Sequence, residues 1–413
     1  MLKKIIYYIS LSIITAVVII MYMFPIDALH TPIDKGTKIF ITSQEISPDR
    51  CYVAAWRNAK QNYIDPEMNG QDWYRWKTKY IRKIKNEDDL KVAVNTMLQS
   101  LDDPFSTYLK GIEYTFQDSQ LNSTIGGIGI NIVEIADKIV IANIIQNGPA
   151  QKAGLKIGDI ILKVDDKDTS KMIISKAVEA MRGNANTIVK LEILRSGKIL
   201  KKNVTREYIS VVYVNYKTLK NNIGYIQIAN FMGNKVPEEF LTAIKATNNL
   251  NGLIIDLRGN RGGTIGNAIA MLKMMINKGN IVTVKYREQI TFNLDANNTA
   301  VFKDKPIIIL VNRGTASAAE VFSGALRYHK KALLIGESTY GKNTIQQIIP
   351  MQNHSGMNLT IAKYYTPDGK DIHNVGLEPD YYVPFFTLDY DEKLDPQLNL
   401  AQKIIKNEIK NKR

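Results

Sequence analysis

The spacing of apolar residues predicts three folded parts with different secondary structure. From 45 to 120 apolar residues recur every three or four positions, which is typical of amphipathic helices in a small helical domain. From 121 to 206 they form short strand-like runs, with one helix at 175–181. From 207 to 385 strand-like runs alternate with helical stretches, which predicts a layered α/β fold. Residues 386–413 read as a basic, amphipathic helix or tail.

The third part contains four short, β-branched runs, with the sequences LIIDL, IVTVKY, PIIILV and ALLIG. Helical spacing is found near 235–248, 264–278 and 316–330. We therefore expect strands and helices that alternate along the chain, with loops at the strand ends.

The N-terminal segment 1–24 is typical of a targeting sequence. Lys3 and Lys4 precede a long, mostly apolar stretch. This stretch is long for a cleaved signal, and 26–28 makes a poor cleavage site, so we favour an uncleaved membrane anchor. The positive-inside rule would leave the rest of the chain outside the cytoplasm. We expect a bacterial envelope protein, anchored in the inner membrane and facing the periplasm, or a periplasmic one if the signal is cleaved.

Composition narrows the class of protein. A length of 413 residues with 45% hydrophobic residues is enough for several cores, and the composition is not that of a disordered chain. Cys51 is the single cysteine, which excludes an intramolecular disulfide and a cysteine-based zinc site. The net charge of +14 is spread along the chain and ends in a basic stretch at 403–413. That stretch fits a solvated helix end, attraction to anionic lipid, or nucleic-acid binding, for which no motif is present.

Ser317 lies where a β-branched run gives way to Ala-rich, helical sequence. A hydroxyl group at such a strand-to-helix turn meets unpaired backbone N–H groups and the positive end of a helix dipole. Both favour an oxyanion that forms beside it. A surface serine without a catalytic role is the plainer interpretation of this residue alone.

Lys342 lies in a comparable setting, after the apolar run 332–336 and a turn flanked by Gly336 and Gly341. A lysine beside apolar strand ends loses hydration. This lowers its pKa and leaves a neutral amine that can accept a proton from a serine. Taken alone, Lys342 also fits a solvated surface residue. The two residues together predict a serine/lysine hydrolase.

Other chemistries fit the sequence less well. The stretch 336–342 matches the first seven positions of a Walker A loop, but Asn343 stands where Ser or Thr must bind magnesium, and Glu337 would place a carboxylate among the phosphates. A serine/histidine pair lacks a GxSxG motif. His329 is too far along the predicted helix to act on the serine, whereas His373 is not excluded, although a loop role suits it better.

Five motifs place the chain near a known family. NRGTASAAE, LRGNRGG, GYIQIANF, GESTYGKNTIQ and YYTPDGKDI resemble motifs of the C-terminal processing peptidases, also called tail-specific proteases, and the resemblance covers nearly all of the chain after residue 45. It implies that Ser317 is the nucleophile, Lys342 the general base and Gln346 the residue that orients the lysine. It also implies that the main-chain N–H groups of Gly263 and Ala318 bind the oxyanion.

Three positions depart from the family pattern. Arg261 stands where proline is usual, Ala319 replaces serine or glycine, and Phe105 replaces histidine in LDDPFSTY. None of these changes removes a catalytic group. Arg261 places a positive charge near the expected oxyanion site, where it would affect substrate preference, but a solvated loop arginine is the simpler interpretation.

The stretch NGPAQKAGLKIGDIILKVDD resembles the central signature of a PDZ domain. Such domains add a peptide strand to their sheet and bind its terminal carboxylate. The resemblance implies that the carboxylate binds at Gly127, Ile128, Gly129 and Ile130, where glycine permits a close approach and isoleucine lines an apolar pocket. In the same family Arg182 is a candidate for coupling between domains.

The sequence thus predicts a multidomain α/β protein with an N-terminal membrane anchor, a small helical domain, a PDZ domain and a crotonase-like protease core. We expect a serine endopeptidase that cleaves exported proteins after its PDZ domain binds their free, apolar C-termini. We expect no metal, cofactor or nucleic acid, and a homo-oligomer is compatible with the family. The alternatives are a non-catalytic PDZ scaffold and a small-ester hydrolase that uses His373.

Overall fold

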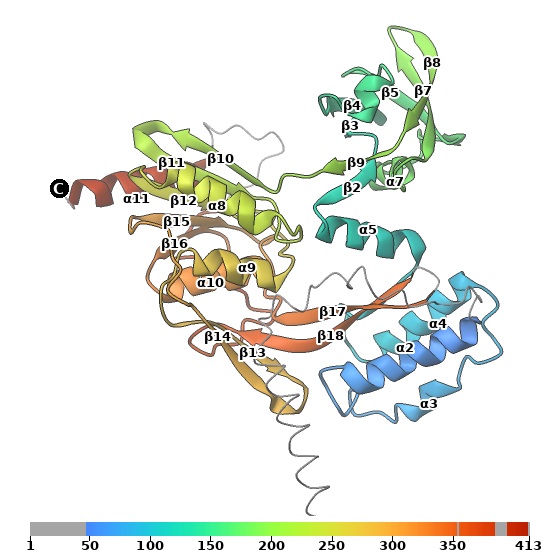
Figure 1. Cartoon of the computed structure of the whole chain (residues 1–413), viewed down its shortest axis with the longest axis horizontal. Coiled ribbons are helices and arrows are strands. Elements are labelled where there is room, and N and C mark those ends of the chain that lie inside the picture. The colour runs from blue at the N-terminus through green and yellow to red at the C-terminus, as the bar shows by residue number, and fades with distance from the viewer. Residues whose placement is uncertain (1–46, 353–354, 385–394, 412–413) are drawn as a thin grey trace, which may run out of the picture. The chain divides into compact units, whose positions relative to one another are not determined.

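The computed structural model describes residues 47–352, 355–384 and 395–411 of the chain (Figure 1). The predicted anchor at 1–24 lies outside these ranges, so it stays a prediction. Within them, no helix combines the length and the apolar character needed to cross a bilayer.

The first described part is mainly helical, as its apolar spacing predicts. It contains α2 (Pro48–Asn62), α3 (Tyr74–Lys77), α4 (Glu87–Gln99), β1 (Thr107–Leu109) and α5 (Gly111–Leu121). Helix α2 begins with proline at its first turn, where the missing N–H group costs nothing. Asn86 caps the N-terminus of helix α4, since its side chain accepts a hydrogen bond of 2.9 Å from the backbone N–H of Asp89.

The core of this helical part includes residues from near the end of the chain. Tyr52, Leu90 and Met97 are fully buried in one cluster with Met357 and Leu359 of β18 (Gly356–Tyr365). Strand β1 also pairs antiparallel with β18. The helical part and the C-terminal strands therefore share one hydrophobic core.

The second part is β-rich, with a core of its own. Its strands are β2 (Thr124–Gly127), β3 (Ile130–Ile135), β4 (Lys138–Ile144), β5 (Ile160–Val164), β6 (Lys167–Asp168), β7 (Ile188–Arg195), β8 (Lys198–Thr205) and β9 (Glu207–Ser210), and its helices are α6 (Pro149–Lys152) and α7 (Ile174–Met181). The main sheet has the strand order β3-β4-β5-β7-β8, which leaves β3 at an edge. Ile141, Ile161 and Leu191 are buried at its centre.

The third part is built around a sheet with the strand order β10-β11-β12-β15-β16-β19. These strands are β10 (Val214–Leu219), β11 (Ile223–Ile228), β12 (Gly252–Asp256), β15 (Ile307–Val311), β16 (Ala332–Gly336) and β19 (Tyr381–Tyr382). From β11 onward neighbouring strands are parallel. The helices that belong to this part are α8 (Val236–Thr247), α9 (Ile265–Lys273), α10 (Ala318–Tyr328) and α11 (Pro396–Asn411).

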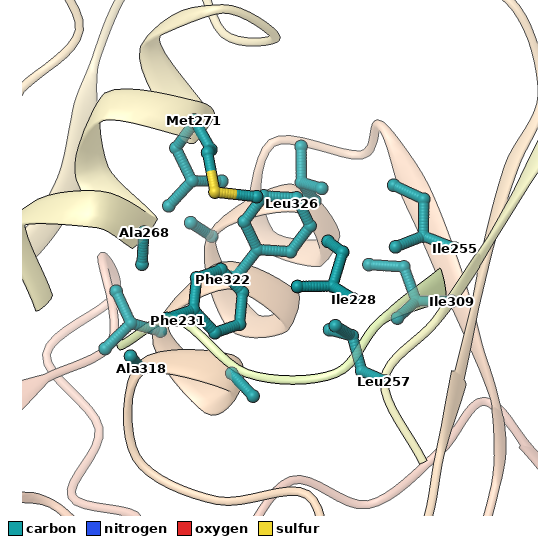
Figure 2. Packing of buried hydrophobic residues seen from close by; sticks show 14 of the residues in the cluster. Ile228, Phe231, Ile255, Leu257, Ala268, Met271, Ile309, Ala318, Phe322 and Leu326 are labelled. Atoms are coloured by element: carbon teal, nitrogen blue, oxygen red, sulfur yellow. The ribbon is translucent and has the colours of Figure 1, made fainter. Parts of the chain in front are cut away.

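Both faces of the sheet are covered at its centre, which explains why β12, β15 and β16 are buried at almost every position. Ile309 points into the cluster formed with α8, α9 and α10, whereas its neighbours Ile308 and Leu310 lie in the cluster formed with α11. On the first face, Phe322 of α10 contacts Phe231 with 5.7 Å between ring centroids, and Ala318 lies in the same cluster (Figure 2). This packing fixes the first turn of α10 against the sheet.

A second sheet joins β1, β18, β13 (Asn280–Tyr286) and β14 (Thr291–Asp295), with β17 (Thr344–Pro350) paired to β18. Strand β17 follows directly after Lys342, so this sheet carries the segment that holds the predicted base. The architecture is mixed α/β, as predicted.

Arg258 connects the C-terminal helix to the end of β12. Its guanidinium group donates hydrogen bonds to Asp256 (2.6 Å) and Asp395 (2.7 Å), and all three side chains are largely buried. Asp395 also accepts a hydrogen bond of 3.0 Å from the N–H group of Leu398 in the first turn of α11. These hydrogen bonds among Asp256, Arg258 and Asp395 connect the start of α11 to the end of β12.

We expect Asp395→Asn to lower the free energy of unfolding by about 2 kcal/mol, because one charge-assisted hydrogen bond to Arg258 is lost while Asp256 remains. Urea unfolding of the full chain measures this change. Asp304→Asn is the control, because Asp304 pairs with Lys331 while its side chain is 82% exposed, so its removal should cost less than 1 kcal/mol. Equal effects of the two substitutions would contradict the assigned role of Asp395.

Candidate active site

Ser317 occupies the turn between β15 and α10, where the sequence predicts it. Its backbone has φ 56° and ψ −120°, a conformation that residues with a side chain rarely adopt. The backbone N–H group of Ser317 donates a hydrogen bond of 2.8 Å to the Glu320 carboxylate one turn later. The residue therefore sits in a strained turn that a specific hydrogen bond holds in place.

The loop that contains Gly262 and Gly263 lies directly against Ser317. A Cβ atom on Gly262 would lie 2.8 Å from the Cβ atom of Ser317 and 2.8 Å from the nitrogen of Ala318. At Gly263 it would lie 2.4 Å from the carbonyl carbon of Phe231, so neither position tolerates a side chain. Within the described residues, the N–H groups of Gly263 and Ala318 donate no hydrogen bond that is seen in the structure. The two N–H groups predicted to bind the oxyanion thus belong to the two segments that meet at Ser317.

Lys342 is partly buried between β16 and β17. Its Nζ donates a hydrogen bond of 2.6 Å to Oε1 of Gln346. The amide nitrogen of Gln346 donates to Oγ1 of Thr344 and Oγ1 of Thr360, each at 3.0 Å, which fixes the amide with its oxygen toward the lysine. Gln346 is therefore placed to orient the amine.

Burial lowers the pKa of Lys342 below its ordinary value, and the carboxylates of Asp103 and Glu320 partly oppose this effect. A lowered pKa increases the fraction of neutral amine near neutral pH, which is the form that accepts a proton. In the described structure Lys342 Nζ makes no direct hydrogen bond to Oγ of Ser317.

The main chains of Ser317 and Lys342 are connected by one buried carboxylate. Oε2 of Glu320 accepts hydrogen bonds from the N–H groups of Ser317 (2.8 Å) and Lys342 (3.0 Å). Oε1 accepts from the N–H group of Gly341 (2.7 Å) and the hydroxyl of Thr339 (2.6 Å). The Glu320 side chain is fully buried, so these four donors replace its hydration.

Tyr364 makes a second connection. Its hydroxyl group lies 2.6 Å from the carbonyl oxygen of Lys342 and 3.1 Å from that of Ser317. Burial raises the pKa of the Tyr364 hydroxyl well above its ordinary value, so it keeps its proton and donates. Sequence reasoning did not single out Glu320 or Tyr364. An acidic residue three positions after a serine at a helix start is the signal that would have found Glu320.

The phosphate-binding loop and the histidine base, which were considered from the sequence, can be compared with the contacts of their residues. The N–H groups of Gly341 and Lys342, which a Walker A loop would offer to phosphate, are used by Glu320. His329 lies at the far end of α10, where its Nε2 is 2.8 Å from the carbonyl oxygen of Asn280. Among the described residues His373 makes no hydrogen bond to Ser317; its backbone N–H group instead donates to Asp371 (2.8 Å), and Arg261 is exposed on its loop.

The residues predicted to bind a terminal carboxylate lie between β2 and β3. Ile128 is buried, and Gly129 has φ 75°, which suits glycine. The carbonyl oxygens of Ile128 and Gly129 accept hydrogen bonds from Ala150 (2.8 Å) and Ile145 (2.9 Å), so the loop is fixed beside the edge strand β3. Across the described residues, no group of His, Cys, Asp and Glu side chains has the arrangement of a metal site.

Comparison with known proteins agrees with this organisation. Residues 222–383 match peptidase family S41, residues 118–194 match the PDZ domain, and residues 50–99 match the Tricorn protease C1 domain. The α/β part is therefore an S41 peptidase domain, and the β-rich part is a PDZ domain.

Several relatives match most of the chain. The chain is 32% identical to the carboxyl-terminal-processing protease of Synechocystis over 83% of each chain. It is 36% identical to the carboxy-terminal processing protease CtpA of Bacillus subtilis, over 80% of this chain and 74% of the relative. Among solved structures, the photosystem II D1 C-terminal processing protease superposes with a TM-score of 0.56 at 26% identity, covering 86% of this chain and 97% of that one. The chain belongs to the carboxyl-terminal processing protease family.

Proposed function

We propose that the chain is a serine endopeptidase that works through a Ser317/Lys342 dyad and selects its substrates by their C-terminal tails. The observation that carries this proposal is the pair of connections between the two residues. Glu320 and Tyr364 bind the backbone of both Ser317 and Lys342, so they keep the nucleophile and the amine in one rigid unit. Such fixed placement is what nucleophilic catalysis requires.

In the proposed mechanism Oγ of Ser317 attacks the carbonyl carbon of the scissile peptide bond while neutral Lys342 takes its proton. The oxyanion that forms is bound by the N–H groups of Gly263 and Ala318. Lys342 then gives its proton to the departing amine, which leaves an acyl-enzyme. A water molecule, deprotonated by Lys342, attacks the ester, and the released serine recovers its proton.

The hydrogen bond between Ser317 and Lys342 that this mechanism needs is absent from the free protein. Catalytic hydrogen bonds are often long before substrate binds and shorten in the complex. Gln346 keeps the amine close until then, because its own amide is fixed by Thr344 and Thr360.

Tail selection is assigned to the PDZ domain. Strand β3 lies at the edge of its sheet and is available to pair with an added peptide strand. The preceding loop, 127–130, supplies the N–H groups for a terminal carboxylate, and the buried Ile128 lies beside it. Protein substrates with small or apolar C-terminal residues fit this arrangement. We further propose that the protein acts on exported proteins on the outer side of a bacterial inner membrane.

The test uses the full chain in mild detergent and an unfolded reporter protein with an apolar C-terminus, prepared as the free acid and as the amide. We expect the amide to bind at least about tenfold more weakly, because charge-assisted hydrogen bonds to the carboxylate are lost. Cleavage at low substrate concentration should fall by the same factor. Mass spectrometry reads the products, and Ser317→Ala serves as the inactive control.

Equal binding and cleavage of both reporters would refute tail selection and leave the dyad untouched. Binding of the free acid without cleavage, by the wild-type chain as well as by Ser317→Ala, would instead favour a PDZ scaffold without protease activity.

A further inference from the structure

Phe105 of the N-terminal helical part lies over the amine of Lys342. The Nζ atom is 4.5 Å from the centroid of the Phe105 ring. At this distance the negative face of an aromatic ring attracts an ammonium group. The ring also shields that side of the amine from water, so Phe105 and Gln346 both contact the Lys342 amine.

The position of Phe105 is fixed by the turn that carries it. The carboxylate of Asp103 accepts hydrogen bonds from the N–H group of Phe105 (3.0 Å) and the hydroxyl of Ser106 (2.6 Å). The hydroxyl oxygen of Ser106 accepts in turn from the N–H group of Thr360 at 3.0 Å, and Thr360 binds the amide of Gln346. The turn 103–106 therefore carries the Phe105 ring on one side of the Lys342 amine and is linked through Thr360 to Gln346, which binds the same amine.

The charged and titratable groups near Lys342 come from several elements. Asp103 lies in the turn before β1, Glu320 on α10 and Tyr364 on β18, and both carboxylates favour the protonated amine. The ring face of Phe105 acts in the same direction as these carboxylates, since it too attracts the ammonium form.

We propose that Phe105 is a positioning residue for the lysine base, contributed by the N-terminal helical part of the chain. Its ring face holds the ammonium form of Lys342 beside Gln346 and keeps water from the amine while the lysine carries the serine proton. The inference rests on the proposed function, because it assumes that Lys342 is the base.

The test is the pH dependence of kcat/KM for the full chain, which reports the ionisation of Lys342 in the free enzyme. Wild-type activity should rise with pH, because only the neutral amine accepts the proton. Phe105→Leu keeps an apolar side chain but removes the ring face, so the ammonium form loses stabilisation. The rise should then occur at lower pH, by about one pH unit. Phe105→Tyr keeps the ring face and should leave the rise where it is.

Phe302→Leu is the matched control. The centroid of the Phe302 ring lies 5.1 Å from Nζ of Lys305. This pair lies before the start of β15, away from the Ser317 turn at its other end. Replacement of Phe302 removes a similar ring–lysine pair and should not move the pH profile. Circular dichroism and thermal melts identify variants that fail to fold, and Phe105→Met then replaces Phe105→Leu with the same expected shift.

The inference would be overturned if the pH profile of a folded Phe105→Leu or Phe105→Met variant did not move or moved to higher pH. Equal shifts in Phe105→Leu and Phe105→Tyr would overturn it too. So would a shift of the profile in Phe302→Leu. Each of these results would leave the proposed Ser317/Lys342 dyad in place. Lys342→Ala tests the dyad separately, because retained proteolysis in that variant would overturn it.

Discussion

Alanine at Ser317 or at Lys342 should abolish proteolysis by the full chain, with kcat/KM lowered by at least about a thousandfold. The first substitution removes the nucleophile and the second removes the group that takes its proton. Because both residues act in one step, the double variant should be no less active than either single variant. Cleavage of an unfolded reporter protein, followed by mass spectrometry, measures the residual activity.

Binding of the reporter and the thermal midpoint should stay close to wild type in these variants, because Glu320 and Tyr364 hold Ser317 and Lys342 through backbone atoms, which alanine keeps. His373→Ala is the matched control and should retain full activity. Turnover that survives in Lys342→Ala but disappears in His373→Ala would reverse the assignment and indicate a serine/histidine enzyme.

The second large effect is expected at Glu320. Glu320→Ala leaves the backbone N–H groups of Ser317, Gly341 and Lys342 without their acceptor inside the fold. Each unpaired group costs about 1–3 kcal/mol, so the free energy of unfolding should fall by at least about 3 kcal/mol. Proteolysis should be lost as well, because the two catalytic backbones are no longer held together. Denaturant unfolding and cleavage assays on the full chain measure the two effects.

Glu239→Gln and Glu320→Gln form a matched pair for this prediction. Glu239 also accepts two backbone hydrogen bonds, from Tyr213 (2.8 Å) and Val214 (3.0 Å), but it lies on α8 and away from the catalytic turn. Both substitutions should destabilise the protein modestly, while only Glu320→Gln should reduce kcat. A similar loss of kcat in both variants would mean that general destabilisation, rather than the Glu320 contacts, limits activity.

Local features of the fold could be predicted well from the sequence. The helices predicted near 235–248, 264–278 and 316–330 contain α8, α9 and α10, and the four apolar runs form β12, β13, β15 and β16. Short-range patterns suffice here, because apolar spacing decides which segments are buried. The turn at Ser317 was also predictable, since a strand that ends before a helix leaves few conformations between them.

Contacts between distant segments were not predictable in this way. Phe105 reaches Lys342 only because the turn 103–106 packs against β18, and nothing near Phe105 in the sequence indicates that partner. The role of Glu320 likewise depends on N–H groups from the segment 339–342, which follows a different strand. Ser317 and Lys342 were singled out from their local settings, whereas Gln346, Gly263 and Ala318 were named from the family resemblance. The chemical roles of all five stay predictions.

The shared core of the helical part and β18 has a consequence for the order of folding. Ser106 and Thr360 are hydrogen-bonded although 254 positions separate them. Contacts of the helical part with Met357 and Leu359 can form only after β18 has been synthesised, and such distant contacts form slowly because a long loop must close first. A growing chain that ends before β18 would lack the partner of Ser106 that fixes the turn 103–106, and with it the contact between Phe105 and Lys342. The placement of Phe105 beside Lys342 is thereby delayed until most of the polypeptide has been made.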